Sequence, residues 1–307
     1  MALALAPRRQ PFPDDVRHSD KDTHRLEGGK GMDATTARQF AQRWAGPWVR
    51  GAKREWHWRR CGADLDLHVA TPDDFPYAVM QHSTPMLRQL QGLPMQLQHN
   101  KITNLRLAVA PLDGRVLLPG QRLSFWKIVG NPNAKRGFLE GVVLDEGTLR
   151  PGVGGGLCQL TNLIYWMTLH TPLTVVERWR HTYDVFPDNA RTQPFASGAT
   201  CAYPALDLQI ENRTDAAYRL SLSVGQTHLV GAWSSDRAPT QAYRIYEAMH
   251  VITNEAPAIY MRRNIIRRKV LNLEGVEIGD ELVTENHAQM MYEPFLPAAP
   301  VRVGIEA

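Results

Sequence analysis

Cysteine is scarce in this chain, and the few present do not form a recognisable disulfide or metal pattern. The 307 residues include three cysteines, Cys61, Cys158 and Cys201, with no C-x-x-C pair among them. A disulfide framework or a cysteine-rich zinc site is therefore not expected. His57 and His68 have no third ligand at a suitable spacing, so the sequence predicts neither a metal nor another cofactor.

Long apolar runs are also missing. No stretch approaches the roughly 18 consecutive apolar residues of a membrane-spanning helix, so we expect no membrane span. The chain begins MALALAPRRQPFPDD, where no basic residue precedes the short apolar stretch, unlike a secretory signal peptide. We therefore expect a soluble, cytoplasmic protein whose thiols are reduced.

A strong excess of one charge is the third absence. Lysine and arginine total 35 against 31 aspartates and glutamates, a formal net charge of +4. Nucleic-acid binding needs a concentrated basic face, so no nucleic-acid partner is expected. The cluster Arg262–Lys269 leaves an RNA contact open, but its pattern is more typical of the solvent face of a strand. No pattern indicates an oligomeric state.

The chain does have enough apolar residues for a sizeable core. It is 43% hydrophobic and 21% charged, which excludes wholesale disorder. Shifts in composition divide it into four expected regions. These are a disordered tail at 1–32, a helical N-terminal region at 33–100, a core domain at 101–236 and a β-rich C-terminal extension at 237–307.

Alternating segments predict β-structure in the second half of the chain. Residues 205–211, 218–224 and the run HLVGAW alternate apolar and polar side chains, as in an antiparallel meander with one face in solvent. Asp207 is then expected to face solvent or to hold a neighbouring strand end. Upstream, the Pro-Gly turn at 119–120 between two apolar runs predicts a hairpin.

The most informative stretch is PGVGGGLCQLTNLIYWMTLHTPLTVVERWRHTYDVF, residues 151–186. Its glycine run leads into a segment whose apolar side chains recur with helical spacing. The helix is expected to end just before Pro172, because a proline disfavours the helical conformation in the residue before it. Cys158 then lies in the first turn, directly after the glycine loop, and a buried strand that follows carries His181.

A cysteine in the first turn of a helix is well placed for nucleophilic chemistry. The unpaired N–H groups and partial positive charge of the helix start stabilise a thiolate. Gly155 and Gly156 let backbone N–H groups approach a ligand and can form an oxyanion pocket. A histidine on a neighbouring strand completes the arrangement of papain-like and transglutaminase-like enzymes. Cys158 as nucleophile and His181 as base are the predicted catalytic pair.

Structural roles remain open for the same residues. A single cysteine is most often a small buried hydrophobe, and Cys201 is predicted to be a packed strand residue. Phosphate binding is disfavoured because GVGGGLCQ lacks the Lys-Ser/Thr of a P-loop. Gln159 is predicted either to donate to an oxyanion or to cover the helix surface. Thr161 and Asn162 are predicted either to line the pocket or to face solvent.

Three segments carry a resemblance to a known family. GQRLSFWKIVG, GGGLCQLTNLIYWMTLHTPLTVVERWRH and DLQIEN resemble the VanW family of vancomycin B-type resistance proteins, over roughly residues 100–235. The resemblance implies a link to glycopeptide resistance and the cell wall, with no established activity.

The family pattern implied by this resemblance also contains a G-x-D-A-T motif, which gives a Cys-His-Asp order. In this chain Gly198 stands where that aspartate would fall. Asp184 and Asp188 are near in sequence, but the offset of Asp184 from His181 puts it on the opposite face of an extended strand. Which residue orients His181 is therefore left open.

These observations predict an α+β fold, in which an antiparallel sheet packs on the helix that carries Cys158. This arrangement resembles a transglutaminase-like or papain-like core. The first functional hypothesis is a cysteine-dependent amidase or acyl transferase acting on a peptide-bearing cell-wall precursor. The alternative is a non-catalytic module that holds a peptide or a partner's tail in the same pocket.

Overall fold

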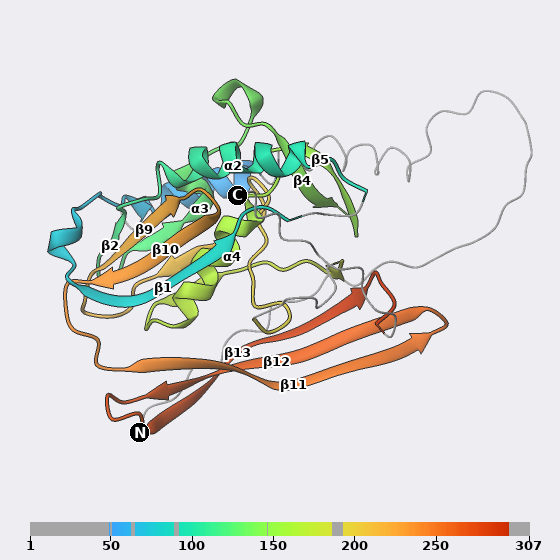
Figure 1. The fold of residues 1–307 in the computed structure, drawn as a ribbon. Helices are drawn as coiled ribbons and strands as arrows, with labels where there is room; N and C mark the ends of the chain where they lie inside the picture. The colour runs from blue at the N-terminus through green and yellow to red at the C-terminus, as the bar shows by residue number, and fades with distance from the viewer. Residues whose placement is uncertain are drawn as a thin grey trace, which may run out of the picture. The chain divides into compact units, whose positions relative to one another are not determined.

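The structure is a computed structural model that describes residues 49, 51–62, 65–88, 92–145, 147–185 and 193–294. All of them belong to one compact unit, Pro47–Ala307. The expected tail at residues 1–32 lies outside the described residues. Figure 1 shows a mixed architecture of mostly antiparallel sheets with few helices. The predicted α+β class is confirmed at this level.

The central sheet has four antiparallel strands in the order β1-β10-β9-β2. Their bounds are β1 (Tyr77–Pro85), β10 (His228–Ser235), β9 (Tyr218–Val224) and β2 (Val116–Leu117). Strands β9 and β10 form as their alternation predicts. Strand β1 corrects the expectation of a helical region at 33–100; within that range, residues 51–60 and 96–100 are helical. It is a strand because β10 supplies backbone partners along its whole length.

A second, smaller sheet has the order β3-β8-β6 and is also antiparallel. Its strands are β3 (Arg122–Ser124), β8 (Gln209–Glu211) and β6 (Thr174–Glu177). The predicted hairpin is wrong, because the strands on either side of the 119–120 turn, β2 and β3, join different sheets. The three-strand meander is wrong for the same reason, since β8 does not pair with β9. Nor does β8 have a polar face in solvent, because Gln209 is 1% exposed.

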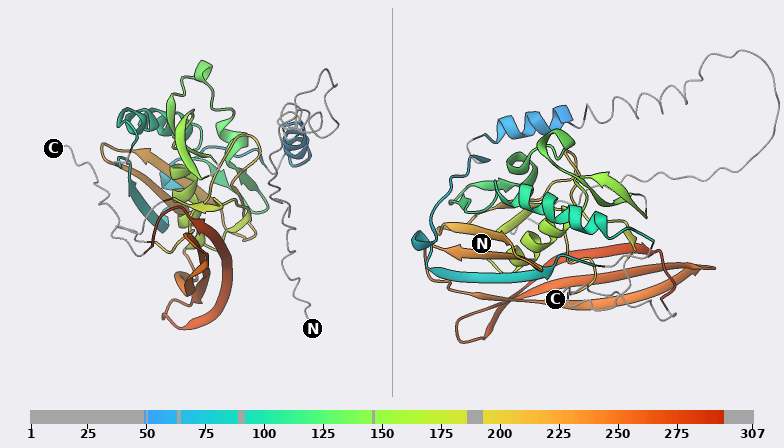
Figure 2. Two further views of the ribbon diagram at one scale, coloured as in Figure 1. Left: turned by 90° about the vertical axis from the view of Figure 1, so that its right-hand side faces the viewer. Right: turned by 45° about the horizontal axis from the view of Figure 1, so that its top comes forward.

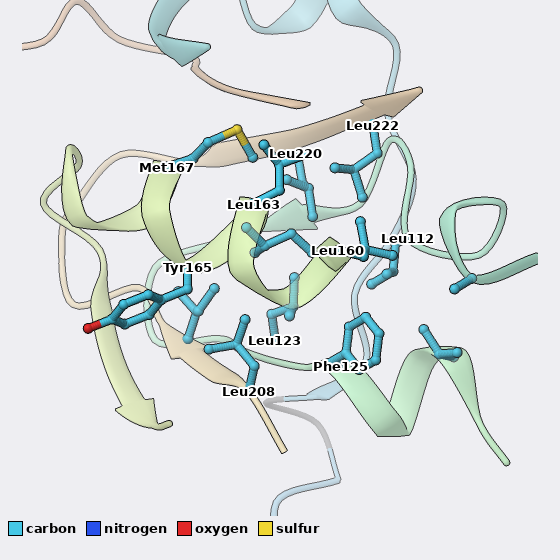
Figure 3. Close-up of a cluster of buried hydrophobic side chains, with 14 of the residues drawn as sticks. Leu112, Leu123, Phe125, Leu160, Leu163, Tyr165, Met167, Leu208, Leu220 and Leu222 are labelled. Atoms are coloured by element: carbon cyan, nitrogen blue, oxygen red, sulfur yellow. The ribbon is translucent and has the colours of Figure 1, made fainter. Parts of the chain in front are cut away.

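Helix α4 (Cys158–Leu169) packs in the middle of this core, as Figure 3 shows. It begins at Cys158 and ends shortly before Pro172, which confirms the helix predicted from the apolar spacing. Its buried apolar side chains include Leu160, Leu163, Ile164 and Met167. Burying a side chain of this size stabilises the fold by roughly 1.5–3 kcal/mol.

The remaining described elements of this part are two helices, two 3-10 turns and one hairpin. They are α2 (Gln96–Val109), α3 (Phe125–Val129), the 3-10 turns Pro72–Asp74 and Ala134–Arg136, and the paired strands β4 (Glu140–Asp145) and β5 (Thr148–Val153). Within the described ranges, no helix is long and apolar enough to cross a membrane.

Three long strands form a third sheet, which Figure 2 shows running side by side. They are β11 (Ala242–Ala256), β12 (Ile259–Leu271) and β13 (Glu277–Met290), and the short β7 (Tyr183–Asp184) joins β13 in parallel. Arg268 of β12 ties this sheet to the end of α4, donating from Nη1 to the carbonyl of Thr171 at 3.0 Å.

The basic cluster Arg262–Lys269 lies on β12, and its charges are matched by acidic side chains of neighbouring strands. Arg268 Nε and Lys269 Nζ contact Glu281 and Glu277 of β13 at 2.5 and 2.6 Å. The expectation of a solvent face fails at Arg262, which is 3% exposed. Most of these cations therefore form ion pairs with carboxylates of the same sheet.

Candidate thiol site at the start of helix α4

A closely packed glycine loop leads the chain into α4. Gly155 lies backbone to backbone against Gly141, where a Cβ on Gly155 would be 2.2 Å from the Gly141 carbonyl carbon. Asn104 of α2 is fully buried, and its Nδ2 donates to the carbonyl oxygens of Gly155 at 2.9 Å and Leu139 at 3.0 Å. Only glycine fits this contact, so the loop is held as part of the core.

Gly156 is the second position that requires glycine. Its φ is +91°, and a Cβ there would be 2.2 Å from Cγ of Lys101. The Lys101 side chain is buried, and its Nζ donates to Oε1 of Gln98 at 2.9 Å. Burial, together with the charge of Arg88, lowers the pKa of Lys101 to about 7. Sequence reasoning missed this amine, because nothing in its pattern distinguishes it from a surface lysine.

Two cysteines meet at the first turn of α4. Sγ of Cys201 lies 3.9 Å from Sγ of Cys158, and Sγ of Cys158 lies 3.7 Å from the carbonyl oxygen of Cys201. Both thiols are free and both residues are half-buried. Cys201 packs against the core as predicted, but it is not in a strand, because it lies between isolated bridges at Thr200 and Ala202. Its contact with Cys158 was not predicted, because no short spacing in the sequence marks it.

The surroundings of Cys158 favour its thiolate. A hydrogen bond with the Cys201 thiol is the largest influence that lowers the pKa of Cys158; burial opposes it, and a hydrogen bond with His181 and the charge of that histidine lower the pKa further. The pKa of Cys158 is therefore held well below its ordinary value. Burial, and then the neighbouring Cys158, raise the pKa of Cys201. Cys158 is thus the thiol of the pair that ionises first.

His181 reaches Cys158 from the connection between β6 and β7, so the predicted continuous strand is wrong. After β6 the chain makes a single bridge at Trp179 and then leaves the sheet. Arg178 holds this departure, because its guanidinium donates to the carbonyl oxygens of Gly198, at 2.9 Å, and Ala196. The Arg178 guanidinium is largely removed from solvent, and this desolvation lowers its pKa. His181 lies near enough to Cys158 to lower the pKa of its thiol, and the catalytic role of the two residues stays a prediction.

Among the described residues, no carboxylate is hydrogen-bonded to His181. Asp184 is buried and accepts hydrogen bonds from Arg262 at 3.1 Å and Tyr292 at 2.9 Å. Asp188 lies outside the described residues. Over the same ranges, no group of three or more histidines, cysteines, aspartates or glutamates is placed to hold a metal ion.

Gly198, which stands where the family resemblance implies an aspartate, packs directly against the side chain of Asn162. A Cβ there would be 2.3 Å from Oδ1 of Asn162, an oxygen that accepts a hydrogen bond from the Ala199 N–H at 2.7 Å. Thr161 is buried, and its Oγ1 donates to the Ala199 carbonyl at 2.6 Å. Asn162 and Thr161 therefore hold the chain that carries Cys201 against the first turn of α4.

Gln159 is engaged elsewhere. Its Nε2 donates to Oγ1 of Thr84 and to the carbonyl of Pro85, both at 2.9 Å, which ties α4 to the end of β1. The backbone N–H of Gln159 donates back to Gly156 at 3.0 Å. In the described part of the chain, the N–H groups of Leu157 and Cys158 donate no backbone hydrogen bond, as is usual for the first turn of a helix.

Comparison with known proteins places these residues in a family. Residues 100–234 match the family model described as VanW like protein, a range that holds the glycine loop, α4, His181 and both cysteines of the pair. Residues 100–234 form a VanW-like region. The resemblance carried by the sequence motifs is confirmed over nearly the same residues.

Two curated proteins show the same relationship. The chain is 29% identical over 217 residues to "Vancomycin B-type resistance protein VanW" of Enterococcus faecalis (strain ATCC 700802 / V583), covering 71% of this chain and 79% of that protein. It is 25% identical over 156 residues to "Uncharacterized protein YoaR" of Bacillus subtilis (strain 168), covering half of each chain. No solved structure matches the chain.

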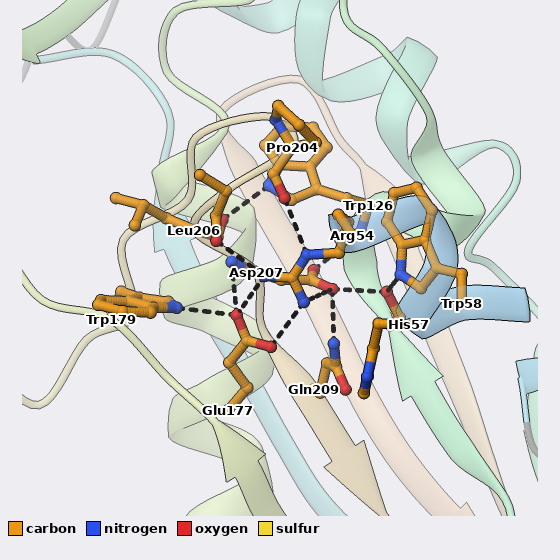
Figure 4. Close-up of polar contacts among 12 residues, drawn as sticks. Arg54, His57, Trp58, Trp126, Glu177, Trp179, Pro204, Leu206, Asp207 and Gln209 are labelled. Atoms are coloured by element: carbon orange, nitrogen blue, oxygen red, sulfur yellow. Dashed lines mark hydrogen bonds and ion pairs between the residues drawn. The ribbon is translucent and has the colours of Figure 1, made fainter. Parts of the chain in front are cut away.

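The VanW-like region also contains a buried polar cluster, shown in Figure 4. Arg54, from the helical residues 51–60 that precede the region, donates to the Glu177 carboxylate at 2.7 and 2.6 Å. Asp207 is fully buried and accepts from Oγ of Ser124 at 2.6 Å and from the N–H of Trp126 at 3.0 Å. The cluster thus fastens the helix at 51–60 to the VanW-like core.

Asp207 settles one alternative left open by the sequence. It does not face solvent; it holds the end of β3 through Ser124, which is the other predicted role. Burial raises the pKa of Asp207 to about 6, although the hydrogen bonds from Ser124 and Trp126 act in the opposite direction. Gln209 adds a further donor, from Nε2 at 3.1 Å. The polar side chains of this segment therefore face each other inside the protein, a partnership that alternation in one strand does not reveal.

Proposed function

We propose that this protein is a cysteine-dependent amidase or acyl transferase acting on a peptide-bearing cell-wall precursor. The observation that carries the proposal is the contact of Cys158, at the start of α4, with His181. A thiolate beside a histidine at a helix start is the activated nucleophile of papain-like and transglutaminase-like enzymes, the analogy on which the reaction class rests.

In the proposed reaction the Cys158 thiolate attacks an amide carbonyl, and the N–H groups of Leu157 and Cys158 receive the developing oxyanion. Protonated His181 gives its proton to the departing amine, which leaves a thioester on Cys158. Neutral His181 then takes a proton from water or from an acceptor amine. The attack of that group releases the acid or the new amide and restores the thiol.

The substrate class rests on similarity. A relative that shares 79% of its length with this chain is named a vancomycin B-type resistance protein. Vancomycin resistance concerns the cell wall, whose precursors carry a short peptide and therefore offer amide bonds. Because we expect this protein in the cytoplasm, the proposed substrate is a precursor at the cytoplasmic stage.

A second candidate is a non-catalytic module that holds a peptide in the same place. It is favoured by one observation, that no carboxylate among the described residues is hydrogen-bonded to His181. Loss of such an orienting group can cost several orders of magnitude in rate, about 10⁴-fold in a related triad. Binding would then survive where turnover does not.

The deciding experiment is the rate at which iodoacetamide alkylates Cys158 as a function of pH, followed by peptide mass. In the wild type we expect the midpoint well below that of an ordinary thiol, and in His181→Ala we expect it to rise, since a hydrogen bond and a charge that lower the pKa are lost. His57→Ala is the matched control, because His57 contacts Cys61 at 3.9 Å and should leave Cys158 unchanged.

Acylation by the p-nitrophenyl ester of N-acetylalanine separates the two candidates. An enzyme gives a burst of nitrophenolate and an acetylalanyl adduct on Cys158 that disappears with time, and Cys158→Ala abolishes both. An ordinary alkylation midpoint that ignores His181, with no adduct, would reject the enzyme and leave the binding module.

A further inference from the structure

In the reaction proposed above, the second thiol beside the nucleophile lowers the pKa of Cys158 but forms and breaks no covalent bond. Cys201 Sγ lies 3.9 Å from Cys158 Sγ, whereas the third cysteine, Cys61, contacts His57 instead. A disulfide bond is about 2.05 Å long, so closing this pair requires a movement of roughly 2 Å shared between two side chains.

The backbone around the pair is held in place from several directions. The chain on either side of Cys201 is pinned, with the Thr200 N–H donating to Trp179 at 2.8 Å and the Ala202 N–H to Leu206 at 2.9 Å. The first turn of α4 is fixed to the same segment through Thr161 and Asn162, whose side chains contact Ala199 at 2.6 and 2.7 Å. The two sulfur atoms are therefore kept as neighbours in the folded protein.

We infer that Cys158 and Cys201 form a reversible oxidation site, in which a peroxide oxidises Cys158 and Cys201 closes the disulfide. This site goes beyond the proposed function and shares with it only the Cys158 thiol. The oxidation needs no amide substrate. Cys61 takes no part in it.

The chemistry balances in two steps with hydrogen peroxide as oxidant. The Cys158 thiolate attacks one peroxide oxygen, the O–O bond breaks, and the products are a sulfenic acid on Cys158 and hydroxide. The Cys201 sulfur then attacks the Cys158 sulfur. Its proton and the sulfenic hydroxyl leave together as water, and an S–S bond forms. A dithiol reductant then reduces the disulfide back to two thiols by thiol–disulfide exchange.

The two cysteines suit these two roles differently. Cys158 is the thiol that ionises first, which fits the step that needs a thiolate. Cys201 stays protonated and adjacent, which fits a resolving thiol that reacts only once the sulfenic acid has formed. The disulfide would remove the nucleophile while protecting it from irreversible oxidation to sulfinic acid.

The test is a titration of the reduced full-length protein with hydrogen peroxide, with iodoacetamide quenching and mass analysis of intact protein and peptides. Wild type and Cys61→Ser should lose the mass of two hydrogen atoms, link the peptides of Cys158 and Cys201, and recover both thiols with dithiothreitol. Cys201→Ser should instead accumulate a dimedone-reactive sulfenic acid on Cys158 and reach the sulfinic acid at a several-fold lower peroxide dose.

The inference is overturned if wild-type Cys158 reaches the sulfinic acid at the same dose as Cys201→Ser, or if the only link formed involves Cys61. Its failure is distinct from failure of the proposed function. The alkylation profile and the ester burst are measured without peroxide, on the Cys201→Ser variant as well as the wild type. A burst without a disulfide rejects the oxidation site alone, and a disulfide without a burst rejects the enzyme alone.

Discussion

Two groups of polar side chains lie near each other in this fold and differ in how closely their atoms are paired. Around Asp207 the hydrogen bonds are short, from 2.6 to 3.1 Å, and join a guanidinium, carboxylates, a hydroxyl, an amide and a backbone N–H. Around Cys158 the contacts are between sulfur atoms or from sulfur to oxygen, at 3.9 and 3.7 Å, and the residues are half-buried.

The difference separates a structural cluster from a reactive one. Buried polar atoms that are fully hydrogen-bonded stabilise the fold and are costly to disturb, because each lost partner leaves a desolvated group. A thiol makes weak hydrogen bonds, so removing it costs the fold little while its ionisation remains open to influence. The cluster with more charge is therefore the scaffold, and the cluster with less charge is the candidate for chemistry.

Asp207→Ala gives the largest expected effect on this comparison. It leaves Ser124, the Trp126 N–H and Gln209 without their acceptor, and we expect the free energy of unfolding to fall by about 3–5 kcal/mol. Urea unfolding followed by tryptophan fluorescence measures this free energy.

Cys158→Ser should lower the free energy of unfolding by less than about 1 kcal/mol. Asp215→Ala, which breaks an exposed pair with Arg237, is the matched control and should have almost no effect. Equal losses in Asp207→Ala and Cys158→Ser would erase the distinction.

Asp207→Asn sharpens the comparison through its pH dependence. Burial raises the pKa of Asp207 to about 6 from an ordinary 3.8, so the folded protein holds this proton more tightly than the unfolded chain. The stability from this group is present below roughly pH 4 and is lost as the pH rises through about 6, a change on the order of 3 kcal/mol. Asparagine cannot ionise, so the stability of wild type relative to the variant should fall over that interval. Parallel curves from urea titrations across these pH values would show that Asp207 does not titrate there.

Glycine substitutions give the smallest expected effect and separate backbone strain from packing. Gly156 and Gly275 both have positive φ, +91° and +80°, but a Cβ meets Lys101 at Gly156 and open space at Gly275. We expect Gly275→Ala to cost about 1 kcal/mol from strain alone and Gly156→Ala clearly more, about 2–4 kcal/mol. Thermal unfolding compares the two. Equal costs would mean that the loop before Cys158 is not packed as the structure shows.

Local patterns in the sequence were sufficient to predict an element wherever the pattern lies within that element. The apolar spacing from Leu157 to Met167 predicted α4 with Cys158 in its first turn, and alternation predicted β9 and β10. These signals depend on one element packing against a common core, so they survive without knowledge of the rest of the chain.

The sequence was insufficient where a residue's partner is distant. Cys201 lies beside Cys158 because Thr161 and Asn162 bind Ala199, and no spacing encodes that approach. Gln209 is buried because Asp207 accepts its hydrogen bond, so polar alternation was misread as exposure. Strand pairing failed for the same reason, as β8 is paired by β3 and β6 rather than by its neighbour in sequence.

The contact between Gly198 and Asn162 bears on how this sequence can change over evolutionary time. An aspartate at 198 places its Cβ 2.3 Å from the Asn162 amide, so as a first step that substitution meets a steric penalty. A smaller residue at 162 removes the obstacle but also gives up the hydrogen bond to Ala199. The two positions are therefore epistatic: each change is harmful in the background of the other's present residue. An aspartate at 198 therefore requires the Asn162 side chain to move or to be replaced, so that restoring a Cys-His-Asp order in this chain couples the two positions.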